Sequence, residues 1–413
     1  MHKIAQKSWS EGGSRARASL PPEGIFRAYD IRGIYPEEIN EDAAYKIARA
    51  FARYLRLEVR DEKLEIVVSS DARESSPALK EAFSDGLSDE GAEIIDAGLT
   101  TTPMHYFILN KTEADGGAMI TASHNPPEFN GMKLSKKSAV SIGAGSGMEE
   151  IKNDSLRGIF QNSENRGSVV KKDFSDEYTK FLAGSFPHLK SYIIKFALAD
   201  KIPGESFDFD GDRVMFRDES GKAAPGDMIT ALLARKYAKP GEKIIYDIPS
   251  SRAVREEIEA AGGVAVESRV GHSFVKALMK KENAVFGGEL SGHYYFRDFF
   301  YSDSGIFAAL AVLDLLRETK KPLSELIKPL ARYFKSEEIN FKIKDKEKII
   351  DKVAAHFTDG KASYSDGIKI EYPDWWFNLR PSNTEDLLRL NIEASTSELL
   401  EEKRKILADL IMK

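Results

Sequence analysis

The sequence predicts a multidomain α/β protein with repeated β-α-β-α-β units, whose sheets are mixed, and a carboxyl-terminal α+β domain. Three observations lead to this prediction. The 413-residue chain is long enough for about two to four domains of ordinary size. Two segments, beginning near residues 63 and 242, alternate strand-like and helical stretches in the same order. From residue 336 onward, strands and helices interleave in a different pattern, which is typical of a small α+β domain.

The two repeated units have matching elements. In chain order the first reads "LEIVVSS", "SPALKEAFSDGLSDEG", "AEIIDAGL", "TPMHYFILNKTEAD" and "GGAMITASHN". The second reads "EKIIYDIPSS", "RAVREEIEAAGG", "VAVESRV", "SFVKALMKKEN" and "AVFGGELSGH", which indicates an internal duplication. Loops at the carboxyl ends of parallel strands are where α/β sheets bind ligands. Ser123 and the stretch 289–293 both occupy such positions.

The composition excludes several classes of protein. The formal charge is −6 with acidic and basic residues interspersed, so no broad positive surface for nucleic acid is expected. The absence of cysteine excludes disulfides, thiolate zinc sites and a cysteine nucleophile, and it fits a cytoplasmic location. The longest apolar run, "FAALAVLDLL" at Phe307–Leu316, is about half a membrane span and predicts a buried helix, with no membrane contact. Residues 1–22 are expected to form a flexible tail, with a transit peptide as the alternative.

Three aspartates alternate in "FDFDGDRV". On an extended backbone Asp208, Asp210 and Asp212 would point to one side, where their charges repel unless a cation lies between them. Oxygen ligands favour Mg²⁺, Mn²⁺ or Ca²⁺. An EF-hand calcium loop is disfavoured because its sixth position, which needs glycine, is Arg213. A solvated acidic turn stays open as the alternative.

The turn "LRPSNTED" is rich in hydrogen-bond donors. It offers a guanidinium, two hydroxyls and an amide, contributed by Arg380, Ser382, Thr384 and Asn383. Such a set suits a phosphate group bound bidentately by arginine. A Ser/Asn turn beside an ordinary surface arginine would account for the same residues.

The stretch "GGELSGHYYF" places polar side chains at a strand end. Glu289, Ser291 and His293 alternate, so they can face one side between glycines that let a ligand approach the backbone. A carboxylate, a hydroxyl and an imidazole suit the vicinal hydroxyls of a sugar. A polar strand end without a ligand is the alternative.

The stretch "TASHNPPEFNGMK" brings a hydroxyl and an imidazole together in sequence. Successive side chains of an extended strand point apart, so His124 is a poor general base for Ser123. A strand-to-helix elbow of the form G-x-S-x-G is absent, which disfavours a hydrolase triad. Taken alone, the stretch equally fits a Ser/Asn turn before two prolines.

Together and in this order, these four loops resemble those of the α-D-phosphohexomutase family, particularly its phosphomannomutase/phosphoglucomutase branch. "FRAYDIRG" at Phe26–Gly33 and "VGHSFVK" at Val270–Lys276 extend the resemblance. It runs from about residue 25 to the carboxyl end. The resemblance implies four domains around a central cleft and a Mg²⁺-dependent mutase, an intramolecular phosphotransferase that exchanges phosphate between the C1 and C6 oxygens of mannose or glucose.

The resemblance also implies residue roles. Ser123 would carry the phosphoryl group, and a bisphosphorylated hexose such as glucose 1,6-bisphosphate would be the intermediate and activator. Asp208, Asp210 and Asp212 would hold Mg²⁺ together with a phosphoserine oxygen. Substrate would be bound by Tyr29, His124, Glu289, Ser291, His293, Arg380, Ser382, Asn383 and Thr384. Arg32, Lys133 and His272 would polarise the reacting groups or move protons.

The expected domains are the tail and four folded units. They are a tail at 1–22, the phosphoserine domain at 23–164, a shortened metal-loop domain at 165–225, the sugar-binding domain at 226–335 and the phosphate-binding domain at 336–413. The metal-loop domain is too short for the full α/β unit that the family carries there. Its shortening would leave apolar surface that a partner chain could cover, so a homodimer is expected.

Other functions stay open. Pro249 stands where some relatives carry a basic residue, which can change the preferred sugar, so glucosamine and pentose phosphates are alternatives. A non-catalytic phosphosugar-binding protein is the rival from another class, and a phosphatase using Ser123 is a third.

Overall fold

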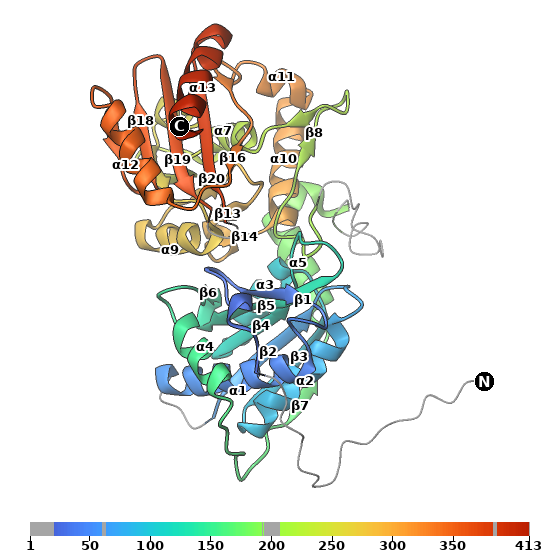
Figure 1. The fold of residues 1–413 in the computed structure, drawn as a ribbon. Coiled ribbons are helices and arrows are strands. Elements are labelled where there is room, and N and C mark those ends of the chain that lie inside the picture. The colour runs from blue at the N-terminus through green and yellow to red at the C-terminus, as the bar shows by residue number, and fades with distance from the viewer. Residues whose placement is uncertain (1–19, 60–62, 192, 194–206, 383–385, 413) are drawn as a thin grey trace, which may run out of the picture.

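The computed structural model describes residues 20–59, 63–191, 193, 207–382 and 386–412. Three sheet-based units are visible in Figure 1: the first, in blue and teal, lies below the second, in yellow and orange, and the third, in red. Most of the tail predicted at residues 1–22 lies outside the described residues. Within the described part of the chain, no helix is long and apolar enough to cross a bilayer.

The first unit contains a seven-stranded mixed sheet in the order β1-β5-β4-β2-β3-β7, with β6 paired to β5. β4, β2, β3 and β7 pair in parallel, whereas β1, β5 and β6 pair antiparallel. The run β2-α2-β3-α3-β4 is the first predicted repeat. The elements are η1 (Glu23–Ile25), β1 (Ile31–Ile34), α1 (Glu41–Val59), β2 (Glu65–Ser70), α2 (Ser76–Asp89), β3 (Glu93–Leu99), α3 (Thr102–Thr112), β4 (Gly116–Ile120), β5 (Phe129–Lys136), η2 (Lys137–Ala139), β6 (Val140–Ser141), α4 (Met148–Arg157) and β7 (Val169–Lys171).

The second unit contains a five-stranded sheet in the order β11-β10-β12-β13-β14. β11, β10 and β12 are parallel, and the run β10-α8-β11-α9-β12 is the second predicted repeat. The apolar run at Phe307–Leu316 lies within α10, as predicted, and packs into the core. The elements are α7 (Gly226–Tyr237), β10 (Lys243–Asp247), α8 (Arg252–Ala260), β11 (Val264–Ser268), α9 (His272–Glu282), β12 (Phe286–Gly288), β13 (Tyr294–Phe296), η4 (Arg297–Phe299), β14 (Ser302–Asp303), α10 (Gly305–Thr319) and α11 (Leu323–Ile327).

The third unit is an antiparallel sheet in the order β15-β20-β19-β18-β17, with β16 on β20 and the helices α12 and α13 packed against it. Its own core includes Trp375, Phe377 and Leu407. The predicted fold class, repeated α/β units followed by an α+β unit, is thereby confirmed. The elements are β15 (Phe334–Lys335), β16 (Ile339–Phe341), α12 (Lys346–His356), β17 (Lys361–Ser363), β18 (Ile368–Glu371), β19 (Trp375–Pro381), β20 (Leu388–Ala394) and α13 (Ser397–Met412).

The described part of residues 165–225 forms no large sheet of its own. β7 extends the first sheet, and β8 (Phe216–Arg217) and β9 (Ala223–Ala224) pair only with each other. After β7 in the chain, α5 (Ser175–Ser185) and η3 (Pro187–Leu189) pack between the first and second units (Figure 1). A single hydrophobic core therefore runs from α3 through α5 to α10.

Aromatic rings make this connection. Phe181 of α5 lies 5.2 Å from Phe107 of α3 and 5.7 Å from Phe300, measured between ring centroids. Phe186, at the end of α5, meets Phe307 of α10 edge to face at 4.7 Å. We call these five residues the aromatic bridge. It joins the first and second units where they would otherwise present apolar faces to water.

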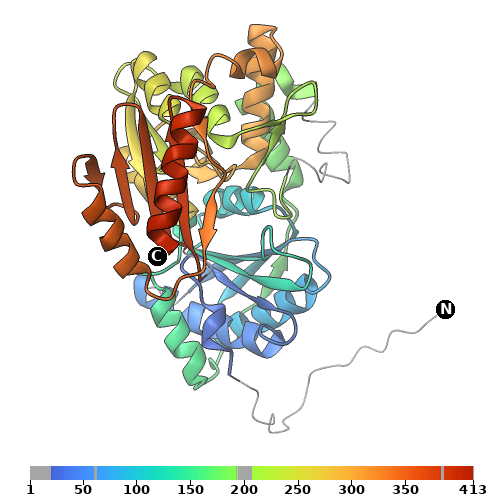
Figure 2. The ribbon, with the colours of Figure 1, turned by 45° about the horizontal axis from the view of Figure 1, so that its top comes forward.

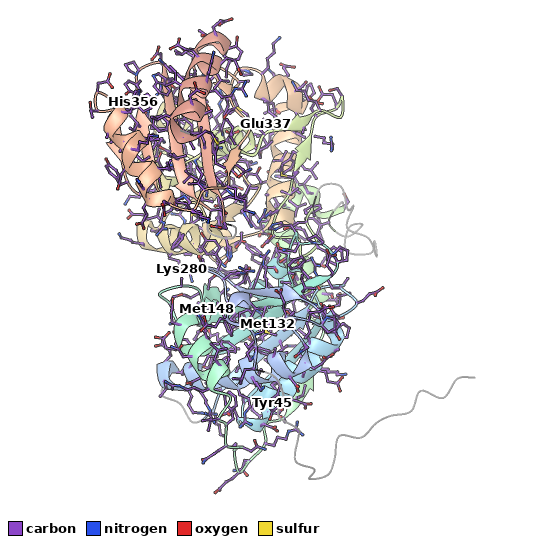
Figure 3. The ribbon with its side chains drawn as sticks, viewed as in Figure 1. Tyr45, Met132, Met148, Lys280, Glu337 and His356 are labelled. Atoms are coloured by element: carbon purple, nitrogen blue, oxygen red, sulfur yellow. The ribbon has the colours of Figure 1, made fainter. Side chains whose placement is uncertain are left out.

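Polar contacts join the units near the ends of their sheets. The Tyr29 hydroxyl of the first unit donates to the Val270 carbonyl of the second at 3.1 Å, and the Val270 N–H donates to Asp366 of the third at 3.0 Å. Near the carboxyl-terminal end of α9, Lys280 donates to the Ser138 carbonyl at 2.7 Å (Figure 3). The turned view places the third unit in front of the other two (Figure 2).

We predict that Phe186→Ala destabilises the protein by about 3 to 5 kcal/mol, because truncating a buried phenylalanine loses its transfer energy and leaves a cavity. Phe186 is 5% exposed. Urea unfolding followed by circular dichroism measures the change. Leu57→Ala on α1, where the leucine is 80% exposed, is the matched control and should change stability little. Equal midpoints for the two variants would contradict the bridging role.

Candidate active site

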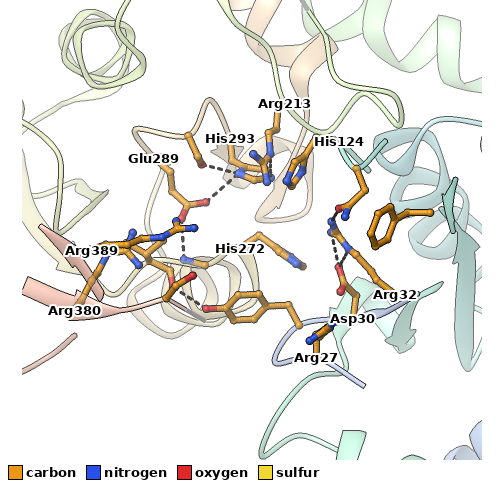
Figure 4. Close-up of a pocket in the computed structure, with 17 residues that line it drawn as sticks. Arg27, Asp30, Arg32, His124, Arg213, His272, Glu289, His293, Arg380 and Arg389 are labelled. Carbon is orange, nitrogen blue, oxygen red and sulfur yellow. Dashed lines mark hydrogen bonds and ion pairs between the residues drawn. The ribbon is translucent and has the colours of Figure 1, made fainter. Parts of the chain in front are cut away.

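A cleft of about 490 Å³ lies where the three units meet. Most residues predicted to bind substrate line it, and Figure 4 shows them converging from the three units. The predicted residues on its wall are Tyr29, Arg32, His124, His272, Glu289, Ser291, His293, Arg380 and Ser382. Asn383 and Thr384 lie outside the described residues. The remaining predicted residues, Ser123, Lys133 and the aspartates, group together next to this wall.

Ser123 follows β4 in a conformation that is unusual for a side chain other than glycine. Its φ is +50°, in the left-handed region. The Ser123 N–H donates to the Thr121 hydroxyl at 2.9 Å, and the side chain is buried. The Ser123 Oγ donates to Asp208 Oδ2 at 3.0 Å. The hydroxyl is thereby held against the aspartate loop, although the two residues are far apart in sequence.

The three aspartates form a compact acidic cluster. Ligand atoms of Asp208, Asp210 and Asp212 all lie within 4.8 Å of one another. One carboxylate oxygen each of Asp210 and Asp212 is buried and has no hydrogen-bond partner among the residues that the structure describes. Burial, followed by repulsion from Asp212 and Asp210, raises the pKa of Asp208 to about 8. Clustered carboxylates with unsatisfied oxygens fit a hard divalent cation such as Mg²⁺.

Lys133 of β5 is the cation already in contact with this cluster. Its Nζ donates to Asp210 Oδ2 at 2.6 Å and also to Asp212. Burial alone would lower the pKa of Lys133, but Asp210 and Asp212 raise it well above its usual value. Lys133 is therefore a stable positive charge, suited to neutralising anions more than to accepting a proton.

Arg32 lies on β1 and reaches the serine loop. Its guanidinium donates to Asp30 at 2.6 and 2.8 Å, to Asn125 Oδ1 at 2.6 Å and to the Ala122 carbonyl at 3.2 Å. These contacts fix a positive charge at the edge of the cleft beside Ser123. The His124 side chain is exposed and lies near Arg213 and His293 in Figure 4.

His293 connects the loop at 289–293 to the aspartate cluster. Its Nδ1 lies 3.3 Å from Glu289 Oε2 and 2.9 Å from Ser291 Oγ, and its Nε2 lies 3.6 Å from Asp212 Oδ1. Burial and Arg213 would lower the pKa of His293, but Asp212 and Glu289 raise it to about 9. His293 is thus cationic near neutral pH, close to the aspartate cluster.

Glu289 also supports its own loop. It accepts hydrogen bonds from the Gly271 N–H at 2.9 Å and from the Tyr295 hydroxyl at 2.5 Å. His272 is the first residue of α9 and directly follows Gly271. Neither of its ring nitrogens has a hydrogen-bond partner among the described residues. Burial and the nearby Lys276 lower the pKa of His272 well below its usual value. His272 is therefore a neutral imidazole that lines the cleft.

The far side of the cleft holds paired arginines. Arg380 at the end of β19 lies opposite Arg389 of β20 in the antiparallel register. Glu338 bonds both, at 3.0 Å to Arg380 and 3.1 Å to Arg389. Ser382 lies beside them on the cleft wall. Two guanidinium groups and a hydroxyl suit a phosphate dianion.

Two residues that sequence reasoning left out belong to this site. Arg389 could have been found by pairing the strands on either side of "RPSNTED", which places it opposite Arg380. Arg213 directly follows the last aspartate, and its Nε lies 3.2 Å from His293 Nε2. In the sequence, Arg213 argues only against a calcium loop, whereas in the structure the Arg213 side chain lines the cleft.

Comparisons with known proteins agree with this geometry. Sequence models of the family described as Phosphoglucomutase/phosphomannomutase match residues 23–171 (alpha/beta/alpha domain I), 225–333 (alpha/beta/alpha domain III) and 338–410 (C-terminal domain). The phosphomannomutase of Methanocaldococcus jannaschii is 36% identical, with 94% of this chain and 98% of the relative covered. The phosphomannomutase of Escherichia coli K12 is 34% identical, with 92% and 96% covered.

A solved structure extends the similarity to three dimensions. The crystal structure of a phosphoglucomutase/phosphomannomutase family protein from Burkholderia thailandensis superposes with a TM-score of 0.82 at 26% identity and covers 95% of this chain and 98% of its own. The alignment with the Methanocaldococcus jannaschii protein spans 454 positions, more than the 413 residues of this chain. That relative therefore has residues that this chain lacks.

We predict that Asp210→Asn weakens Mg²⁺ binding at least about tenfold, since even residues that only support a metal ligand contribute that much. Isothermal titration calorimetry on the purified protein measures the affinity. Asp351→Asn, on the exposed face of α12, is the matched control and should bind Mg²⁺ as the unaltered protein does. Unchanged affinity in Asp210→Asn would remove the aspartate cluster as the metal site.

Proposed function

The chain belongs to the α-D-phosphohexomutase family and is a phosphosugar mutase, and we propose that it interconverts hexose 1-phosphate and hexose 6-phosphate through a phosphoserine at Ser123. Mannose phosphates are the proposed preferred substrates, with glucose phosphates second, because the relatives at 34–36% identity are phosphomannomutases. The observation that carries the proposal is the hydrogen bond between Ser123 and Asp208, which holds the Ser123 hydroxyl against the aspartate cluster.

The cleft has two anion-binding ends, as this reaction requires. Arg32 lines one end, next to Ser123 and Lys133, and Arg380 and Arg389 line the other. A sugar phosphate bound by its existing phosphate at the arginine end presents its free hydroxyl to Ser123. The bisphosphorylated intermediate then turns around and presents its other phosphate. A general phosphate clamp supports both orientations better than a tightly shaped sugar pocket.

In the first transfer a bond forms between the sugar oxygen and phosphorus while the bond between phosphorus and Ser123 Oγ breaks. The sugar hydroxyl loses a proton, for which neutral His272 is the proposed acceptor. The Ser123 oxygen departs with a negative charge that the cationic Lys133 is proposed to stabilise; in the return transfer this oxygen attacks the other phosphate, and His272 gives its proton to the departing sugar oxygen. The return transfer reverses these steps at the other end of the sugar. Arg32 and Lys133 stabilise the negative charge on the transferred group throughout.

Mg²⁺ is the proposed metal, held by Asp208, Asp210 and Asp212 with a phosphoserine oxygen. When bound, it supplies positive charge beside the transferring phosphoryl group. Glucose 1,6-bisphosphate is the proposed activator, because it phosphorylates Ser123 directly. Glu289, Ser291 and His293 are proposed to contact the sugar, and His124 and Tyr29 to border it. A cytoplasmic location and a homodimer remain predictions.

We also propose that residues 165–225 are what remains of a second domain. The matched family segments for the first and third domains end at residue 171 and begin at 225. Since the relative's alignment is longer than this chain, a deletion in this interval accounts for the difference. The aromatic bridge takes over the connection between the remaining units.

We predict that the protein converts mannose 1-phosphate to mannose 6-phosphate when supplied with Mg²⁺ and a trace of glucose 1,6-bisphosphate. Ser123→Ala should reduce turnover at least about a thousandfold, because the group that carries the phosphate is lost. Ser220→Ala, in the exposed β8–β9 turn, is the control.

Full activity in Ser123→Ala would place the phosphate carrier elsewhere. Net release of inorganic phosphate would instead indicate a phosphatase. A lack of product from every hexose, hexosamine and pentose phosphate tested would indicate a binding protein.

A further inference from the structure

We propose that Arg73 and Phe209 form a clasp that positions the phosphoserine loop against the metal loop. Neither residue is among those that line the cleft. Arg73 precedes α2 in the first unit, and Phe209 lies between the first two aspartates of the metal loop. The inference rests on the roles proposed above for Ser123 and the aspartates. It concerns how the two loops are held in register.

Arg73 uses its guanidinium to hold the serine loop. Its side chain donates to the carbonyls of Ser123 at 2.6 Å, Asn125 at 2.8 Å, Pro126 at 2.8 Å and Phe129 at 3.0 Å. Asp71 fixes the other side of the group, at 3.2 Å from Nε. Because Arg73 is almost fully buried, no solvent competes for these contacts. A lysine has one ammonium group and could replace few of them.

These contacts explain the backbone of Ser123. A non-glycine residue at positive φ is held there by its surroundings. The Thr121 hydroxyl accepts the Ser123 N–H, and Arg73 bonds the Ser123 carbonyl, so both peptide groups are fixed. The backbone conformation sets the direction of the side chain, which here points to Asp208. Arg73 therefore orients the hydroxyl without touching it.

Phe209 connects the same arginine to the metal loop. Its ring lies 4.9 Å from Arg73 Cζ, within the range of a cation–π interaction. The side chain is otherwise 55% exposed, so burial in a core does not account for it. In the described part of the chain, two backbone hydrogen bonds tie the metal loop to the neighbouring units. The Thr102 N–H donates to the Asp210 carbonyl at 2.8 Å, and the Gly305 N–H donates to the Gly211 carbonyl at 3.1 Å. Through Arg73, the Phe209 ring adds a tie to the serine loop.

The test uses the full chain and compares Phe209→Leu with Phe209→Tyr. We expect Phe209→Leu to weaken Mg²⁺ binding roughly two- to fivefold by calorimetry, the contribution of a partly exposed cation–π contact. We expect kcat to fall while KM for the sugar phosphate stays unchanged. Phe209→Tyr keeps the ring and should restore both. Phe334→Leu makes the same change at a 48% exposed phenylalanine of β15 and should alter neither.

Arg73→Lys provides the second arm. Lysine keeps the positive charge but lacks the several N–H donors of the guanidinium group. We therefore expect kcat to fall about a hundredfold because Ser123 is misplaced, with KM unchanged. In that background Phe209→Leu should add little, because the two residues act as one unit. The inference is overturned by Phe209→Leu with normal Mg²⁺ affinity and kcat, by a rise in KM in place of the fall in kcat, or by full additivity. If the unaltered protein shows no mutase activity, the proposed function fails, and calorimetry still tests the clasp.

Discussion

Three carboxylates held within 4.8 Å of one another are the constraint on which the rest of the site depends. Such charges repel strongly in a buried setting, so the loop is stable only where cations reach it. Lys133 comes from β5 of the first unit, while His293 and Arg213 border the cluster on the side of the second. The acidic loop thus draws cationic groups from both units to one point, and Ser123 is fixed at the same point through Asp208. A bound Mg²⁺ would complete this balance of charge.

Among the described residues, backbone contacts to the first and second units hold this loop in place. Its backbone is tied to Thr102 and Gly305, at the beginnings of helices in the first and second units. The aromatic bridge fixes those units relative to each other through α5, with Phe186 against Phe307. The burial of aromatic rings therefore takes the part that a larger sheet would otherwise have. The contacts that position the aspartates therefore come from neighbouring elements of both units.

Much of this arrangement could be predicted from the sequence. Alternating strands and helices placed the loops of Ser123 and Glu289 at strand ends, and the period of two in the aspartate loop indicated a cation site. What the sequence could not show depends on register and packing. Arg389 belongs to the site because β19 and β20 pair with Arg380 opposite it. Arg73 meets the serine loop because β2 and β4 pair in parallel, which brings the segments after these two strands together. The engagement of Glu289 by Gly271 and Tyr295 likewise requires the folded loop.

The central claim is that Ser123 carries a phosphoryl group beside the aspartate cluster. Intact mass spectrometry of the protein before and after incubation with glucose 1,6-bisphosphate and Mg²⁺ tests it most directly, with peptide mapping to locate any added group. The account predicts an increment of one phosphate on Ser123, which is removed again when excess mannose 1-phosphate or glucose 1-phosphate is added. No increment, or a phosphate located on a different residue, would contradict it.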